Sequence, residues 1–177
     1  MTRVRAAIAA AALAFLSACG QAPSPPDASA ASAPVEAPES AFIRAAAQND
    51  AYQLAASRVA VAQAGSERAR AFAQLMEREH AASQSELAQI AASARLAAPA
   101  ATLDENHQTY IDMMEEAPPA EFDVIYASQQ VLLHQQIIAA YEGYLAQAPD
   151  GPLKTWAQAR LARLRQNLEA ARAIPRQ

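Results

Sequence analysis

Apolar residues recur at spacings of three and four along most of the chain after about residue 41, which is the period of a helix that buries one face. Between residues 66 and 97 the spacing forms one continuous stripe: Phe72, Met76, His80, Ser83, Leu87, Ile90 and Ala94. The last part of the chain carries a second stripe: Leu153, Ala157, Leu161, Leu164, Leu168 and Ala171. The pattern predicts an all-α fold built from amphipathic helices.

Breaking and capping residues divide this pattern into four long helices and one short helix. We expect long helices over residues 40–64, 66–97 and 120–147, and a fourth from residue 152 onward. Gly65 ends the first helix and Ser66 is a candidate N-cap for the second. Asp150-Gly151-Pro152 caps the fourth, with proline acceptable in the first turn.

Four amphipathic helices joined mostly by short turns predict a four-helix bundle over residues 42–174. The connection between the second and third long helices is the exception, because it carries a short extra helix over residues 103–116. This connection is long enough to permit a crossover. An up-down bundle with a decorated loop and a crossover bundle both remain open.

The first 18 residues have the pattern of a signal peptide. Arg3 and Arg5 precede an apolar run over residues 6–16, which is too short to span a bilayer. The sequence Leu16-Ser17-Ala18-Cys19 then resembles the lipobox of bacterial lipoproteins, which predicts lipidation at Cys19 and a membrane contact through that anchor. The alternative is an ordinary secretory signal in which Cys19 is incidental.

The residues that follow Cys19 predict both the membrane to which the protein is sorted and a tether. Gly20 stands where lipoproteins kept at the inner membrane commonly have Asp, so we expect the periplasmic face of the outer membrane. Residues 19–41 are rich in Ala, Pro and Ser, and a segment of this composition cannot bury enough apolar area to fold. It is predicted to be a spacer between the lipid and the helical domain.

The net charge and the cysteine content bear on the binding partners and on the source of stability. Loss of Arg3 and Arg5 with the signal reduces the basic residues from 14 to 12 against 18 acidic ones, a formal net charge of −6. Binding to nucleic acid is disfavoured, because it needs a basic face. The single cysteine excludes an internal disulfide, so burial of helix faces must supply the stability.

Two histidines and two acids are the candidates for chemistry. Glu77 and Glu79 precede His80 on one helix, and His134 lies on another, so facing helices could present them to a transition metal ion, the candidate cofactor. The alternative is that both histidines are hydrogen-bonded core residues and the acids form a solvated face. His107 has a weaker claim. Four aromatic residues are assigned to packing: Tyr126, Tyr141, Tyr144 and Trp156.

Several short segments, in this order and spacing, resemble the bacterial domain-of-unknown-function 4142 family. They are Phe72-Ala73-Gln74-Leu75-Met76-Glu77-Arg78-Glu79-His80, then Phe122-Asp123-Val124-Ile125-Tyr126, His134, and Leu153-Lys154-Thr155-Trp156-Ala157. The resemblance covers about residues 42–174. It implies a ferritin-like helical bundle, often secreted or lipid-anchored, without a settled biochemical activity.

This chain departs from the family pattern where metal ligands would be expected. A family glutamate falls at Gln53, the acid before the second-helix histidine is Glu79, and the closing histidine falls at Asn167. Glu79, His80 and His134 remain, with Asp123 as a weaker addition. Because amides bind transition metals less well than carboxylates or imidazoles, a family metal site would be weakened here.

Three functions follow as hypotheses. The leading one is a non-enzymatic, lipid-anchored periplasmic protein that acts through an envelope protein partner, as an interaction or envelope-stress accessory protein. The competitor is a ferritin-like metal-binding protein or oxidoreductase with a degenerate Glu/His site. The third is oligomerisation through an aromatic or alanine-rich helix face.

Overall fold

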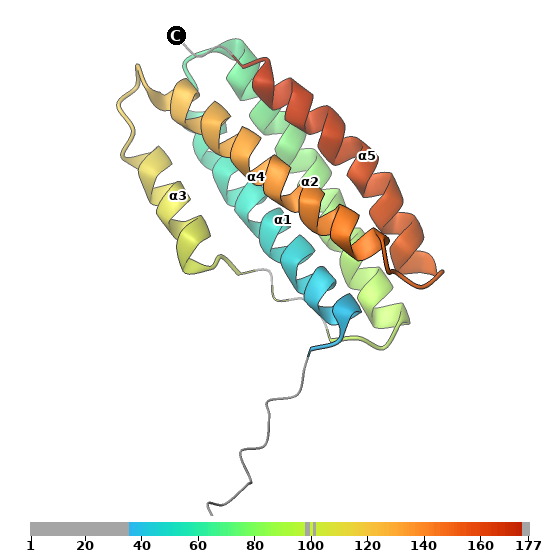
Figure 1. Cartoon of the computed structure of the whole chain (residues 1–177). Coiled ribbons are helices and arrows are strands. Elements are labelled where there is room, and N and C mark those ends of the chain that lie inside the picture. Colours follow the sequence, from blue (N-terminus) through green and yellow to red (C-terminus); the bar gives the residue numbers. More distant parts are fainter. Residues whose placement is uncertain (1–35, 98–99, 101, 175–177) are drawn as a thin grey trace, which may run out of the picture. The chain divides into compact units, whose positions relative to one another are not determined.

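The computed structural model describes residues 36–97, 100 and 102–174, and all its regular structure in these ranges is helical. The elements are α1 (Pro38–Gln63), α2 (Glu67–Ser93), α3 (Glu105–Glu115), α4 (Phe122–Leu145) and α5 (Pro152–Arg172) (Figure 1). The all-helical prediction is confirmed. The predicted signal, Cys19 and most of the predicted tether lie outside the described residues.

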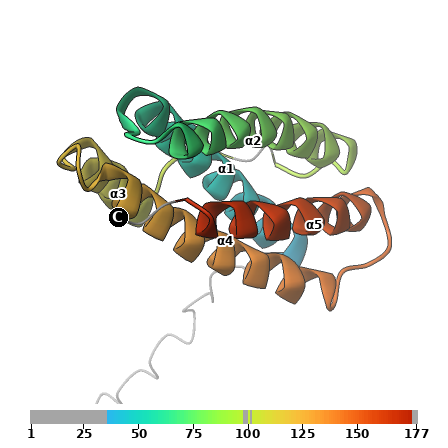
Figure 2. The same cartoon turned by 90° about the horizontal axis from the view of Figure 1, so that it is seen from above.

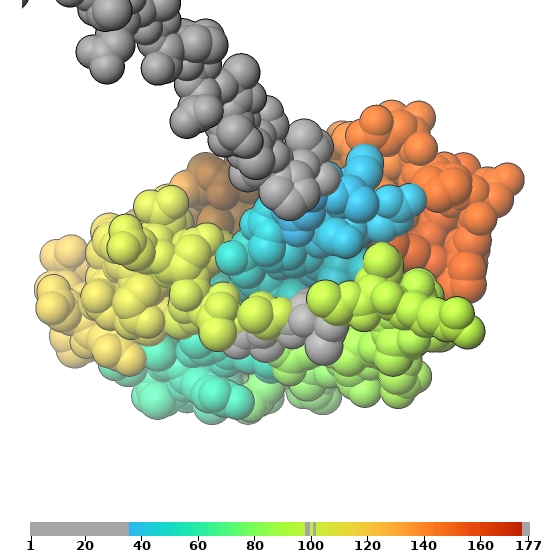
Figure 3. All heavy atoms as spheres, turned by 90° about the horizontal axis from the view of Figure 1, so that it is seen from below, coloured from blue at the N-terminus to red at the C-terminus, as the bar shows by residue number. Residues whose placement is uncertain are grey.

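The four long helices pack in two hairpins that contact each other. α1 packs along α2, and α4 packs along α5, while α1 also contacts α4 and α2 contacts α5. α2 and α5 run roughly parallel in Figure 2. The short helix α3 lies against α1 and α4, and Figure 3 shows it beside α1.

The first helix begins earlier than the sequence pattern predicts. α1 starts at Pro38 rather than at residue 40, so residues 38 and 39, which we assigned to the tether alone, belong to the helix. Proline fits this position because the first helical N–H groups have no partner inside the helix and the proline ring already holds a helical φ. Glu39 also lies in the first turn, where its negative charge interacts favourably with the positive end of the helix dipole.

The turn between α1 and α2 has the predicted cap and a further constraint. The Ser66 hydroxyl accepts a hydrogen bond from the Ala69 N–H at 3.1 Å, as an N-cap should. The Asp123 carboxylate in the first turn of α4 accepts from the N–H groups of Gly65 (2.9 Å) and Ser66 (2.8 Å). Asp123 therefore fastens the two hairpins together at one end.

The second helix ends earlier than predicted because of a left-handed residue. Arg95 has φ 56°, and α2 stops at Ser93 rather than near Ala97. The Leu96 N–H bonds the Ala91 carbonyl (2.9 Å) and the Arg95 N–H bonds the Ala92 carbonyl (3.1 Å), which is the Schellman pattern. The helix thus ends with its last carbonyls satisfied, at the expense of a non-glycine residue in a conformation that glycine prefers.

The boundaries of α3 and α4 differ from the predicted ones by one or two residues, and α5 begins at the predicted residue. α3 begins after Asp104, whose Oδ1 accepts from the His107 N–H at 2.8 Å. The N-cap of α5 is Gly151, which offers no side chain, and Asp150 instead pairs with Lys154 at 2.9 Å. Pro152 occupies the first turn of α5, as expected.

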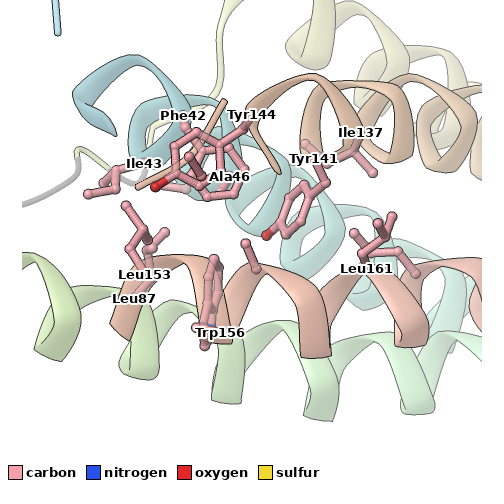
Figure 4. Packing of buried hydrophobic residues seen from close by; sticks show 14 of the residues in the cluster. Phe42, Ile43, Ala46, Leu87, Ile137, Tyr141, Tyr144, Leu153, Trp156 and Leu161 are labelled. Carbon is pink, nitrogen blue, oxygen red and sulfur yellow. The ribbon is translucent and has the colours of Figure 1, made fainter. Parts of the chain in front are cut away.

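The aromatic residues assigned to packing are buried, which confirms that assignment. Phe42 stacks on Tyr144 with ring centroids 4.0 Å apart, and its ring meets Tyr141 edge-on at 4.7 Å. Trp156 from α5 approaches Tyr141 at 5.9 Å, so α1, α4 and α5 meet in one aromatic group (Figure 4). Such pairs stabilise by about 1 kcal/mol beyond the area that they bury.

Replacing Arg95 by glycine is expected to stabilise the protein. Glycine adopts the left-handed conformation without the steric penalty of a Cβ, so Arg95→Gly should add about 1 kcal/mol to the free energy of unfolding. Thermal unfolding followed by circular dichroism should show a midpoint raised by about 3 °C.

The matched control is Ala92→Gly in the last turn of α2, where the backbone is helical and glycine should lower the midpoint. A fall in both variants would show that Arg95 does not carry strain at this position.

Candidate functional site

Buried polar side chains form a layer between two apolar clusters. One cluster contains Phe42 to Ala47, Leu87, Ala91 and the end of α4; the other contains Tyr52 to Ala64, Ala69 to Met76 and the start of α4. Asp50 on α1, His80 and Ser83 on α2, and His134 on α4 fall in sequence between these groups, whereas Gln53, Ser57 and Gln130 lie among the residues of the second cluster. We call this set the polar layer: Asp50, Gln53, Ser57, His80, Ser83, Gln130 and His134.

Within the polar layer, both oxygens of the Asp50 carboxylate have hydrogen-bond partners. Asp50 is 2% exposed, and one of its oxygens lies 2.7 Å from His80 Nδ1. Its other oxygen accepts a hydrogen bond from the Ser83 hydroxyl at 2.8 Å. Since the carboxylate is the acceptor, we assign a hydrogen to His80 Nδ1; in the neutral tautomer of the ring, Nε2 then carries the lone pair.

His134 has the same arrangement with a backbone partner. Its Nδ1 lies 2.8 Å from the carbonyl oxygen of Gln130, one turn earlier on α4. A carbonyl can only accept, so Nδ1 donates and Nε2 is again the atom with a lone pair. Burial, followed by the nearby His80 and Arg160, lowers the pKa of His134 to about 4, although the Gln130 carbonyl acts in the opposite direction, so the ring is neutral at pH 7.

The two imidazole rings lie near each other with their second nitrogens unpaired. The ring centroids are 6.3 Å apart and the planes make an angle of 76°. Among the described residues, neither Nε2 atom has a hydrogen-bond partner, nor do the side-chain amides of Gln53 and Gln130. Unpaired buried polar atoms are rare enough in native proteins that a group of them indicates a place for polar ligands or ordered water.

The predicted metal ligands do not all come together. The structure buries His80 and His134 in one layer, but the Glu79 side chain contacts α5, where it accepts from Arg163 (3.1 Å) and Asn167 (2.8 Å). Glu77 is half-buried and has no hydrogen bond or ion pair within residues 36–174 as described. In those same ranges, no group of three or more His, Cys, Asp or Glu side chains is placed to hold a metal ion.

The two weaker candidates have local structural roles. Asp123 binds the turn between α1 and α2, as described above. His107 lies in the first turn of α3, where its Nδ1 is 3.1 Å from the carboxylate of Asp104. Neither belongs to the polar layer.

Sequence reasoning missed Asp50 and the part played by its neighbours. Asp50, Gln53 and Ser57 follow one another at spacings of three and four on α1, the same spacing that identified apolar faces elsewhere. A polar residue at a predicted core position was the available signal. Gln129 was missed as well: its side chain accepts from the Tyr52 hydroxyl (2.9 Å) and donates to the Tyr110 carbonyl (3.0 Å), which joins α1, α4 and α3.

The depressed pKa of His134 predicts a dependence of stability on pH. In the unfolded chain the ring takes up a proton near the ordinary pKa of 6.5, whereas in the folded protein it does so only near 4. Between these values the unfolded state binds more protons, so the free energy of unfolding should fall as pH falls from 6.5 to 4, by roughly 3 kcal/mol at most.

Urea unfolding at several pH values in this window measures the effect. His134→Gln should have a shallower loss of stability toward low pH than the unsubstituted protein. Equal slopes for His134→Gln and the unsubstituted protein would contradict the assignment.

Within the described residues, no helix is both long and apolar enough to cross a bilayer. Comparison with curated proteins found no match, and neither did comparison with solved structures. Comparison with protein families matched residues 24–174, which include all five helices, to the family described as a domain of unknown function, DUF4142. The chain belongs to the DUF4142 family.

Proposed function

We propose that this protein is a lipid-anchored envelope protein that acts by binding rather than by catalysis. The observation that carries the proposal is the sequence Leu16-Ser17-Ala18-Cys19 directly after a short apolar run. Lipidation at Cys19 would hold the chain on the periplasmic face of the outer membrane. The helical domain would follow a spacer that ends at Pro38, where α1 begins.

The burial of the titratable side chains supports binding over catalysis. Asp50, His80 and His134 are between 0% and 2% exposed, and both oxygens of Asp50 are occupied by His80 and Ser83. A catalytic acid or base must come within hydrogen-bond reach of its substrate. A substrate could reach these groups only if the helices separated.

The arrangement of the helices supports the ferritin-like bundle. Two hairpins, α1 with α2 and α4 with α5, pack against each other, and the short helix α3 lies in the connection between them. The side chains of the polar layer are buried between facing helices, which is where bundle proteins build their sites. The acidic mature chain disfavours nucleic acid as a partner, and the proposed anchor would place the domain among envelope proteins.

Replacing Cys19 by serine tests the anchor. The wild-type protein should float with membranes and incorporate an alkyne-labelled fatty acid, because a diacylglycerol with an N-acyl chain holds a protein on a membrane far more firmly than one chain does. Cys19→Ser should lose the label. Wild-type protein that is unlabelled and released into the soluble periplasmic fraction would contradict the proposal.

A second candidate function, binding of a transition metal ion, is supported by the orientation of the two buried histidines. Ligating histidines almost always donate their other ring N–H to a carboxylate or a backbone carbonyl. His80 has this relation to Asp50, and His134 has it to the Gln130 carbonyl. Each ring therefore keeps its Nε2 lone pair for a ligand bond.

The donors fit such an ion only in part. His80 and His134 would supply two imidazole nitrogens, while Glu79 is held by α5 and Asp50 faces the other ring nitrogen. The nearby amides of Gln53 and Gln130 have unpaired oxygens, but amides are weaker ligands than carboxylates. This set suits zinc or copper better than the carboxylate-rich di-iron chemistry of ferritin-like proteins.

Elemental analysis of the untagged protein after exposure to iron, manganese, zinc or copper tests this candidate. We expect one zinc or copper ion per chain and its loss in His80→Gln and in His134→Gln, with His107→Gln as the matched control that keeps it. Absence of metal from the unsubstituted protein, or retention in both layer variants, would leave the histidines as core residues.

A further inference from the structure

A groove of about 340 Å³ lies between α2 and α5, outside the polar layer. This is the size range of small-molecule sites. Its walls combine apolar side chains with three guanidinium groups: Leu75, Ala82 and Trp156 among the apolar ones, and Arg78, Arg160 and Arg163. Two acids, Glu79 and Glu86, also line it, so the groove has more positive than negative charge.

Arg160 is the unusual residue of the groove. It is only 6% exposed, and its Nε has no hydrogen-bond partner among the described residues. Its closest acidic neighbour is Glu79, at 3.9 Å between Arg160 Nη1 and Glu79 Oε2, which is too long for a hydrogen bond. A buried cation is expensive unless an anion pairs with it closely, and here the pairing is incomplete.

The two acids in the groove are already engaged. Glu79 has its short contacts with Arg163 (3.1 Å) and Asn167 (2.8 Å), not with Arg160. Glu86 accepts a hydrogen bond from the Trp156 indole N–H at 2.9 Å, which fixes the indole in the wall of the groove. The walls thus contain an incompletely paired guanidinium and the ordered, largely buried indole of Trp156.

We propose that this groove binds a small organic anion, with a carboxylate paired to Arg160 and an apolar or aromatic body against Trp156 and Leu75. The planar fork of a guanidinium matches a carboxylate in two parallel hydrogen bonds, which a lysine cannot reproduce. Arg78, on the same wall, adds a second positive charge. The site does not use Cys19, but it adjoins the buried histidines, because the Arg160 guanidinium also contributes to the lowered pKa of His134.

The proposal predicts that removing the negative charge of Glu79 raises the affinity of the groove for an anion. Its carboxylate is the nearest competitor for Arg160, at 3.9 Å. Removing that charge while keeping the side-chain volume, in Glu79→Gln, should strengthen binding of an anion. A residue that merely supported the fold would not strengthen binding when substituted.

Trp156 is the only tryptophan in the chain, so its fluorescence reports on the groove directly. Benzoate is the probe, titrated into the purified full-length protein at constant ionic strength, with heat of binding measured in parallel. Benzylamine and benzyl alcohol are the controls, because they carry the same ring with a positive charge and with no charge. We expect one saturable site for benzoate and neither control to bind comparably.

The variants locate the site. Arg160→Lys keeps the charge but loses the fork, and benzoate affinity should fall about tenfold, the worth of one charge-assisted hydrogen bond. Glu79→Gln should bind more tightly by a few fold. Arg165→Gln is the matched control, since Arg165 lies on the same helix, is exposed and pairs with Glu142 away from the groove.

Helix content and unfolding midpoint are measured for each variant. If Arg160→Lys does not fold, Arg78→Gln, at an exposed position, replaces it and should weaken benzoate severalfold. A linear, unsaturable change in emission, equal binding of benzylamine, or unchanged affinity in the folded arginine variants would overturn the proposal.

Discussion

The hydrogen bonding of one buried carboxylate constrains how the helices of this protein fit together. Asp50 is almost completely shielded from water, so its charge must be compensated by donors inside the protein. Both donors come from α2, at positions 80 and 83, which share a face of that helix. A shift of α2 along α1 by one turn would break both bonds at once. Apolar burial is non-directional, whereas these two hydrogen bonds form only in one register.

The same constraint organises the interior into three levels. Apolar residues from every long helix lie on each side of the polar layer, and the aromatic group around Phe42 closes one of these sides. At the other end, Asp123 holds the first turn of α4 to the turn before α2. Polar contacts therefore fix the register of the helices at two heights, and apolar burial supplies the stability between them.

Sequence periodicity predicted the helical content well because each helix buries one face and each turn carries a breaking or capping residue. The stripe on α5 is buried throughout, and Ser66 caps α2 as expected. The early end of α2 was not predictable, since Arg95 adopts a conformation that its side chain disfavours. The site was predicted in part: His80 and His134 were identified, but Glu79 turned to α5 and Asp50 was missed. Periodicity shows which face a residue lies on, whereas the partner helix decides what it meets there.

The short helix α3 is held less firmly in the fold than the four long helices. Only Ile111 and Met114 of its eleven residues are buried, and a helix of that length is marginal without tertiary support. Its contacts with α1 and α4 include the bridge through Gln129 to the Tyr110 carbonyl. α3 is therefore the natural unit of local unfolding, a segment that can detach and return while the long helices stay folded. Its opening would uncover Tyr52 and Gln129, and amide hydrogens of α3 would exchange with solvent well before those of the interior.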